Sequence, residues 1–135
     1  MRKSLRLTVL LLFSWIAVNG QTATFSAAPG GMPAYGWLTD STIVVGRVIV
    51  NNPVTVAFEF VNNGKAPLVI SRVEPSCGCT AVDYSKEPVG PGQKGYIKTT
   101  YNAASIGVFT KTVTVFSNTA DIRKVLSLKG EVVTN

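Results

Sequence analysis

The sequence predicts an all-β protein: an immunoglobulin-like antiparallel β-sandwich of about seven strands, after an N-terminal signal peptide. Three observations support this prediction. Apolar and polar residues alternate with a period of two in most segments after residue 41. Turn-forming Gly, Pro and Asn residues separate these segments at short intervals. No long segment shows the helical period of 3.6 residues. A small β-barrel is the alternative architecture for such a pattern.

The clearest strand signal lies in residues 54–60. Apolar side chains occupy one face of this segment, whereas Thr55, Ala57 and Glu59 occupy the other, which is the alternation of a half-buried strand. Six further strands are expected, over residues 42–45, 68–73, 80–84, 97–101, 109–116 and 125–133. Turn signals lie between them, and the Asn-Asn-Gly sequence at residues 62–64 is expected to use the positive φ angles of a tight reversal.

Residues 1–20 have the three-part layout of a secretory signal peptide. Arg2, Lys3 and Arg6 precede an apolar stretch over residues 7–18, and small residues follow it. As a helix this stretch would span roughly 18 Å, which is too short for a hydrocarbon core of about 30 Å. A retained membrane anchor is the alternative interpretation. We expect an exported protein, periplasmic or extracellular, with no stable membrane span once the leader is removed.

Residues 21–40 are expected to form a flexible lead-in, and residues 41–135 the sandwich domain. The lead-in is rich in Gly, Pro, Ala and Thr, which interrupt regular structure. Tyr35 and Trp37 stand out within it, because aromatic side chains gain most from packing. We expect these two residues either to dock on the domain or to form a contact surface for a partner.

The net charge does not indicate nucleic-acid binding. The chain has 13 Lys and Arg residues against 7 Asp and Glu residues, a formal charge of +6. Three of the positive charges and none of the negative charges lie in residues 1–20, so the processed chain would carry ten against seven, or +3. Its lysines are scattered and form no basic stripe. We therefore expect no nucleic-acid partner.

The composition also argues against an enzyme. The chain has no histidine, which excludes a histidine-based catalytic triad, general base or zinc triad. Its carboxylates show no paired cluster, and the loop at residues 90–95 (GPGQKG) has neither phosphate-loop spacing. We expect no catalytic residue, cofactor or metal. The edge strands of a sandwich can take up an extended peptide. We therefore predict a non-enzymatic binding or scaffolding module, with another envelope or extracellular protein as partner and an oligomeric state that the sequence leaves open.

Cys77 and Cys79 are the only cysteines, and Gly78 separates them. In a fully extended strand their Cα atoms would lie about 6.6 Å apart, near the upper limit for a disulfide. Gly78 can adopt backbone angles that bend the chain and shorten this distance. Three interpretations stay open: a structural pair, either disulfide-bonded or buried; a strained disulfide that exchanges with an outside thiol; or two thiolates that hold copper(I).

Several ordered motifs resemble a known family. The strings FEFVNNGKAPLVISRVEPSCGCT, PVGPGQKGYIKTTYN, GVFTKTVTVFSN and LSLKGEV follow one another within residues 43–133. They resemble a bacterial secreted family of domains of unknown function, number 1573, whose hallmark is an SCGCT-type motif. That family is similar to the Ig-like domains of the ASH/hydin and major-sperm-protein group, so the resemblance implies a seven-stranded sandwich and export, with no established reaction. Members often show an aromatic-Phe-Gly step before the first long strand, where this chain has Ile43-Val44-Val45-Gly46.

Overall fold

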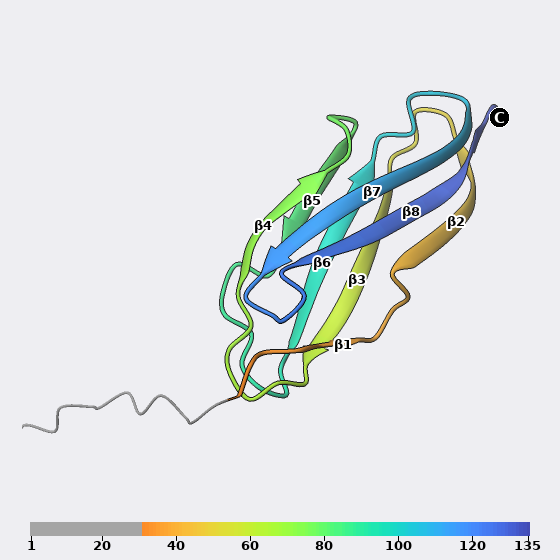
Figure 1. The fold of residues 1–135 in the computed structure, drawn as a ribbon. Helices are drawn as coiled ribbons and strands as arrows, with labels where there is room; N and C mark the ends of the chain where they lie inside the picture. Colours follow the sequence, from red (N-terminus) through yellow and green to blue (C-terminus); the bar gives the residue numbers. More distant parts are fainter. Residues whose placement is uncertain (1–30) are drawn as a thin grey trace, which may run out of the picture.

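The computed structural model describes residues 31–135, which form a sandwich of two four-stranded sheets (Figure 1). These residues form strands, turns and loops and contain no helix. The predicted signal peptide and residues 21–30 of the predicted lead-in lie outside the described residues. The strands are β1 (Tyr35–Trp37), β2 (Thr42–Ile49), β3 (Val54–Asn62), β4 (Ile70–Pro75), β5 (Thr80–Tyr84), β6 (Lys94–Tyr101), β7 (Gly107–Ser117) and β8 (Arg123–Val133). The predicted all-β sandwich is confirmed, with eight strands in place of about seven.

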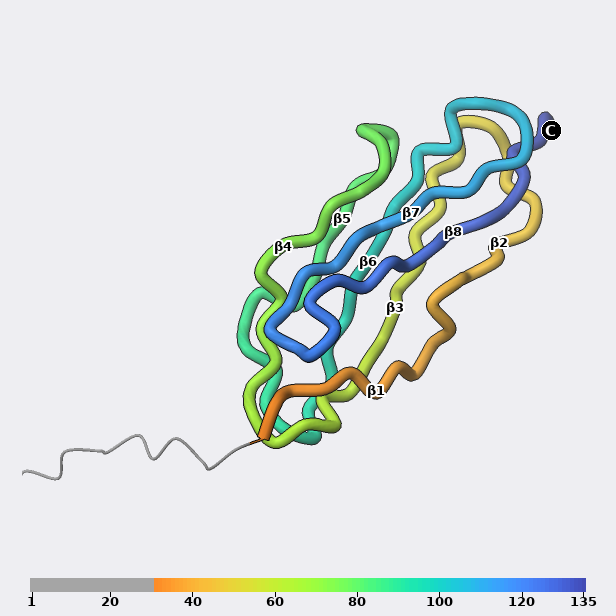
Figure 2. Tube along the Cα trace, viewed as in Figure 1, coloured from red at the N-terminus to blue at the C-terminus, as the bar shows by residue number. Residues whose placement is uncertain are grey.

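The strand order is that of an immunoglobulin-like domain. One sheet has the order β1-β3-β6-β5 and the other has the order β2-β8-β7-β4. With strands lettered in chain order, these are the A-B-E-D and A′-G-F-C sheets. The β2–β8 pair is parallel, whereas the other strand pairs in the two sheets are antiparallel. This difference from a purely antiparallel sandwich arises because the chain passes from β1 in one sheet to β2 in the other without a hairpin (Figure 2).

β1 belongs to the sandwich and lies within the segment that was predicted to be a flexible lead-in. Tyr35 pairs with Asn62 and Trp37 pairs with Phe60, so β1 forms an edge of the first sheet. Residues two positions apart on a strand share a face, and both aromatic rings therefore pack on Phe60. The ring centroids of Tyr35 and Trp37 lie 4.8 and 5.6 Å from that of Phe60. Residues 35–37 therefore form a strand in the structure, and the rings of Tyr35 and Trp37 dock on the domain, which is one of the two arrangements expected for them.

The core lies between the two sheets, as the alternation in residues 54–60 predicted. Phe58 and Phe60 are fully buried, whereas Thr55 and Glu59 on the other face are exposed. Gly95 of β6 pairs with Phe60, and a Cβ atom added to Gly95 would overlap the Phe60 ring. The aromatic ring therefore fills the space that a side chain on β6 would otherwise occupy.

The turn at residues 62–64 differs from the expectation. None of its residues has a positive φ angle. Instead, Oδ1 of the fully buried Asn62 accepts a hydrogen bond from the Gly64 N–H at 2.9 Å, which is the side-chain mimic of a turn that asparagine can form. The reversal is therefore built by a side chain and does not need left-handed backbone.

Candidate binding surfaces

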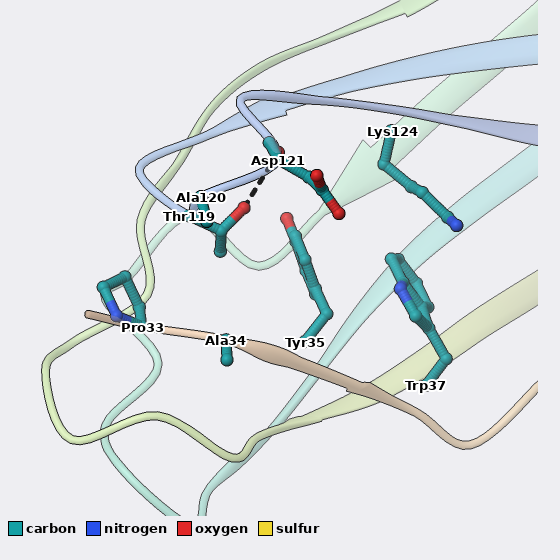
Figure 3. Close-up of a pocket in the computed structure, with 8 residues that line it drawn as sticks. All are labelled: Pro33, Ala34, Tyr35, Trp37, Thr119, Ala120, Asp121 and Lys124. Atoms are coloured by element: carbon teal, nitrogen blue, oxygen red, sulfur yellow. Dashed lines mark hydrogen bonds between the residues drawn. The ribbon is translucent and has the colours of Figure 1, made fainter. Parts of the chain in front are cut away.

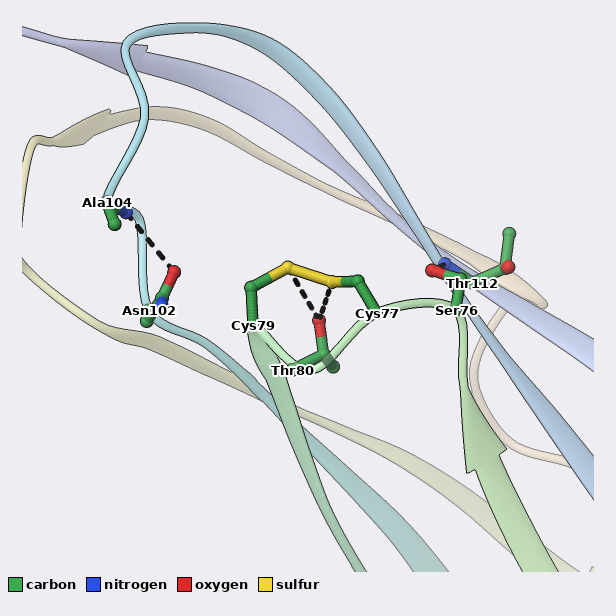
Figure 4. The surroundings of a disulfide bond; sticks show 7 residues. All are labelled: Ser76, Cys77, Cys79, Thr80, Asn102, Ala104 and Thr112. Carbon is green, nitrogen blue, oxygen red and sulfur yellow. Dashed lines mark hydrogen bonds between the residues drawn. A yellow bond between two sulfur atoms is a disulfide. The ribbon is translucent and has the colours of Figure 1, made fainter.

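Cys77 and Cys79 are joined by a disulfide in the turn between β4 and β5 (Figure 4). Their Cα atoms are 5.3 Å apart, closer than in an extended strand, because the Thr80 N–H donates to the Cys77 carbonyl at 3.3 Å and closes a turn. Thr80 Oγ1 lies 3.6 Å from the Cys77 Sγ and 4.0 Å from the Cys79 Sγ. Gly78 has no positive φ angle. The bend therefore does not use the left-handed conformations that glycine allows.

This segment, residues 76–80, is called the disulfide turn below, and hydrogen bonds hold it to both sheets. The Ser76 N–H donates to the Thr112 carbonyl at 2.8 Å, and the Thr112 N–H donates to Ser76 Oγ at 3.1 Å, so one end is attached to β7. At the other end, the Asn102 N–H donates to the Cys79 carbonyl at 3.1 Å, just beyond β6. The disulfide turn therefore fixes the position at which β5 begins.

The sulfur atoms of the disulfide turn are bonded to each other, so neither is a thiolate in this structure. The copper(I) interpretation requires thiolates, which form only when this bond is reduced. Exchange with an outside thiol starts from the disulfide itself, so that interpretation stays a prediction. Within residues 31–135, no three or more His, Cys, Asp or Glu side chains are grouped in a way that could hold a metal ion. The geometry is that of a structural clip between β4 and β5.

β5 presents an open and regular sheet edge. It pairs with β6 over five residues without a register shift, and it has no partner strand on its other side. The Ser85 N–H donates to the Tyr96 carbonyl at 3.1 Å. This bond shows which residues of the antiparallel ladder form hydrogen-bonded pairs: Ser85, and then every second residue before it. Because backbone groups alternate along such a ladder, the N–H and C=O groups of Val82 and Tyr84 point away from β6. No hydrogen bond outside the strand ladders engages these groups within residues 31–135.

On β5, apolar and aromatic side chains face the core, whereas a charged side chain faces the solvent. Val82 and Tyr84 turn inward and pack, partly buried, against the core. Asp83 turns outward and accepts a hydrogen bond from Tyr96 Oη at 3.2 Å. That hydrogen bond and the negative charge of Asp83 raise the pKa of the Tyr96 phenol. Beyond the strand, Lys86 Nζ lies 3.2 Å from the centre of the Tyr84 ring.

The other three edge strands are less suited to pairing with another chain. β1 has only three residues. β2 has a register shift between Val44 and Arg47, which interrupts its line of backbone groups. β4 has a register shift between Ile70 and Arg72 and ends at Pro75, which has no N–H to donate. Among the edges in the described residues, β5 therefore offers the most continuous one.

A second candidate surface is a cavity of about 240 Å³ beside β1, at the sheet edge opposite β5 (Figure 3). We call it the β1 pocket. Tyr35 and Trp37, the residues predicted to contact a partner, stand side by side in its wall, with ring centroids 4.6 Å apart and ring planes 18° from parallel. The rest of the lining comes from the chain before β1, from the turn between β7 and β8 and from the start of β8: Pro33, Ala34, Thr119, Ala120, Asp121 and Lys124. A role of the aromatic pair in partner binding stays a prediction.

The β1 pocket carries one unpaired charge of each sign. Figure 3 shows the Asp121 carboxylate close to the Tyr35 hydroxyl and the Lys124 ammonium near Trp37. Within residues 31–135, neither Asp121 nor Lys124 has an opposite charge within the 4.0 Å of an ion pair. Nothing in the sequence distinguishes Asp121, in the turn before β8, or Lys124, near the start of β8, because the fold alone brings them to β1.

The Tyr35 hydroxyl is buried and has no hydrogen-bond partner within the described residues. Its burial raises the pKa of the Tyr35 phenol, and the nearby Ser117 hydroxyl opposes this rise to a smaller extent. Ser117 Oγ is hydrogen-bonded to Thr119 Oγ1 at 3.0 Å, and its geometry toward Tyr35 falls short of a hydrogen bond. Tyr35 is thus a buried donor that the fold leaves unsatisfied.

Solved structures with the same fold include a bacterial and a human protein. A protein of unknown function from Porphyromonas gingivalis W83 superposes with a TM-score of 0.64 at 14% identity, over 83% of this chain and 51% of that one. The chain therefore spans about half the length of that protein. The ASH/PapD-like domain 7 of human CEP192 superposes with a TM-score of 0.59 at 9% identity, over 77% of this chain and 88% of that one. These likenesses show the immunoglobulin-like fold.

An enzyme is also among the similar structures. The Vibrio cholerae VesB protease superposes with a TM-score of 0.57 at 14% identity, over 76% of this chain but only 32% of the protease. At such identities the likeness concerns the fold alone, so no activity is carried over. No curated protein matches the chain. In the part of the chain that the structure describes, no helix has the length and apolar character needed to cross a bilayer.

The motif resemblance found in the sequence is supported by a match to a family model. The model is described as "Protein of unknown function (DUF1573)", and it matches residues 38–132, from just after β1 to the last residues of β8. This range includes the disulfide turn and most of the sandwich. The chain therefore belongs to the DUF1573 family.

Proposed function

We propose that this protein is an exported, non-enzymatic binding module that takes up an extended segment of another envelope or extracellular protein by strand addition to β5. The observation that carries the proposal is the open edge of β5, which is regular over five residues and begins at the disulfide turn. Export is supported by the leader-like composition of residues 1–20.

An added strand would give the outward backbone groups of Val82 and Tyr84 the partners that they lack in the free domain. Each such hydrogen bond contributes about 0.5–1.5 kcal/mol net. Alternate side chains of the added strand would point inward and cover the partly buried Val73, Val82 and Tyr84 at the seam between β4 and β5. The disulfide turn supports this mode, because a strand fixed at its first residue loses less conformational entropy on binding.

The test uses a substitution that removes one outward donor and leaves the β6 ladder intact. Val82→Pro deletes the outward N–H. Val82→Thr keeps this N–H and replaces the valine side chain by one of similar size. Short peptides selected from a displayed random library on the native protein serve as probes. We expect the selected peptides to protect the Val82 and Tyr84 amides from hydrogen exchange. Val82→Pro should weaken peptide binding by about tenfold or more, and Val82→Thr should preserve it.

Two results would contradict strand addition at β5. One is a set of selected peptides that bind Val82→Pro as well as they bind the native protein. The other is tight binding with no change in exchange at Val82 and Tyr84, which would place the binding surface elsewhere. Circular dichroism of both variants must match that of the native protein, so that loss of binding is not confused with loss of fold.

A further inference from the structure

We propose that the β1 pocket binds a single sugar unit, that is, a neutral ring with adjacent hydroxyl groups. This site lies at the sheet edge opposite β5 and is independent of strand addition. The inference starts from the size of the cavity. Its volume of about 240 Å³ is below the roughly 300 Å³ at which pockets for drug-sized ligands begin. The β1 pocket therefore has room for one small ring.

The charges in the β1 pocket favour a neutral ligand. Asp121 and Lys124 both line the cavity, and neither is paired with an opposite charge in the described residues. An anion would be attracted by Lys124 but repelled by Asp121, and a cation the reverse, so neither kind of ion is favoured by both groups. A purely apolar ligand would remove both charged groups from water and offer them no hydrogen bond, which is costly.

A ligand with adjacent hydroxyl groups avoids these costs. Each hydroxyl both donates and accepts, so one ligand can donate to the Asp121 carboxylate, which only accepts, and accept from the Lys124 ammonium, which only donates. Such charge-assisted hydrogen bonds are roughly twice as strong as neutral ones. Beside these groups, the rings of Tyr35 and Trp37 form part of the wall. The C–H groups of a sugar ring can be buried against aromatic rings of this kind.

The aromatic wall is already in place before a ligand enters. Tyr35 and Trp37 are stacked on each other and packed edge-on against the fully buried Phe60. Neither Asp121 nor Lys124 uses its side chain in a hydrogen bond or ion pair within residues 31–135. Thr119 Oγ1 donates to the Asp121 carbonyl at 2.9 Å, so the loop is held through its backbone while the carboxylate stays free to bind.

The experiment is a titration of the full-length protein followed by NMR at the Trp37 indole N–H, which is assigned from the spectrum of Trp37→Phe. The probes are glucose, galactose, mannose and N-acetylglucosamine, with cellobiose and lactose as two-ring sugars. Arginine, glutamate and glycine betaine are the cationic, anionic and zwitterionic comparisons. We expect a saturable shift with at least one sugar below about 100 mM, a concentration that fills a site with a Kd of about 10 mM. Binding of a two-ring sugar identifies the terminal unit of a glycan as the ligand, and binding of single rings alone identifies a free sugar.

Matched variants test which groups make the site. Asp121→Asn and Lys124→Met remove the charges, and each should weaken sugar binding by about tenfold. Lys129→Met is the control, because Lys129 is an exposed lysine on the same strand as Lys124 and does not line the β1 pocket. It should bind like the native protein. The proposal is overturned if no sugar gives a saturable shift, if arginine, glutamate or betaine binds more tightly than every sugar, or if both pocket variants bind sugar as the native protein does.

Discussion

The side chain of Asn62 is hydrogen-bonded to the main chain of Val89, from Nδ2 to the carbonyl oxygen, at 2.8 Å. The same Nδ2 donates to the Ala66 carbonyl at 2.7 Å, while Oδ1 accepts from the Gly64 N–H at 2.9 Å and the Ala34 N–H at 3.3 Å. Asn62 is fully buried. The side-chain amide of Asn62, at the end of β3, is thus bonded to the segment before β1, to the turn after β3 and to the segment before β6.

The Asn62→Ala variant should be among the most destabilised single substitutions in this domain. It would leave several buried or partly buried backbone groups without partners, and each costs about 1–3 kcal/mol. We expect the free energy of unfolding to fall by about 3–5 kcal/mol in urea denaturation. Asn63→Ala is the control, because Asn63 is exposed and should change stability by less than about 0.5 kcal/mol. Equal losses in the two variants would show that the amide network does not carry this stability.

Two glycines should respond in opposite ways to the same added methyl group. At Gly95 the new Cβ would overlap the Phe60 ring, whereas at Gly78 it would meet no atom within 4 Å. We expect Gly95→Ala to lower the free energy of unfolding by about 1–3 kcal/mol, since the buried ring cannot move away. Gly78→Ala should leave it unchanged or raise it by up to about 1 kcal/mol, through a less flexible unfolded chain. A large loss at Gly78 would mean that the disulfide turn needs the freedom of glycine.

Removal of the disulfide should weaken the domain without unfolding it. Because the bond closes a ring of only three residues, the unfolded chain gains little freedom when it is absent. Replacing both Cys77 and Cys79 by Ser should lower the free energy of unfolding by about 1–2 kcal/mol and leave the far-ultraviolet circular dichroism unchanged. Intact mass after alkylation of the native protein checks that the bond is present. Complete unfolding of the double variant would contradict the structural clip described here.

The parts of the fold that the sequence predicted depend on local pattern. The alternation in residues 54–60 identified Phe58 and Phe60 as core residues, because the direction of a side chain on a strand depends only on its neighbours. β1 was missed because it is three residues long, and what orders it is contact with Phe60, more than twenty positions away. The parallel pairing of Thr42 with Ser127 was missed for the same reason, since it joins opposite ends of the domain.

The same distinction between local features and features of the assembled fold applies to the candidate binding surfaces. The pairing of Cys77 with Cys79 was among the interpretations open at the sequence level, because the residues are two positions apart and their distance is set locally. By contrast, the open edge of β5 depends on the order of strands in the sheet, which no single segment encodes. Asp121 and Lys124 reach β1 only because the turn between β7 and β8 and the start of β8 lie beside it. Such placements follow from the assembled sandwich.

The unsatisfied hydroxyl of Tyr35 leads to a prediction about stability and its pH dependence. The substitution Tyr35→Phe removes this buried hydroxyl, which has no partner, and keeps the ring that packs on Phe60. An unpaired buried hydroxyl costs about 1–3 kcal/mol, so we expect the variant to be more stable than the native protein by about 1 kcal/mol at neutral pH. Urea denaturation of the two proteins at the same ionic strength measures the difference.

The difference should grow in alkali. Burial raises the pKa of Tyr35 in the folded state above its ordinary value of 10.0, so the unfolded chain loses this proton first as the pH rises. The native protein therefore keeps the full contribution of the neutral phenol below pH 10 and loses it as the pH rises toward the folded-state pKa. Tyr35→Phe has no such group, while the other three tyrosines are the same in both proteins. A stability difference that stays constant between neutral pH and about pH 10.5 would show that the hydroxyl is exposed to water in solution.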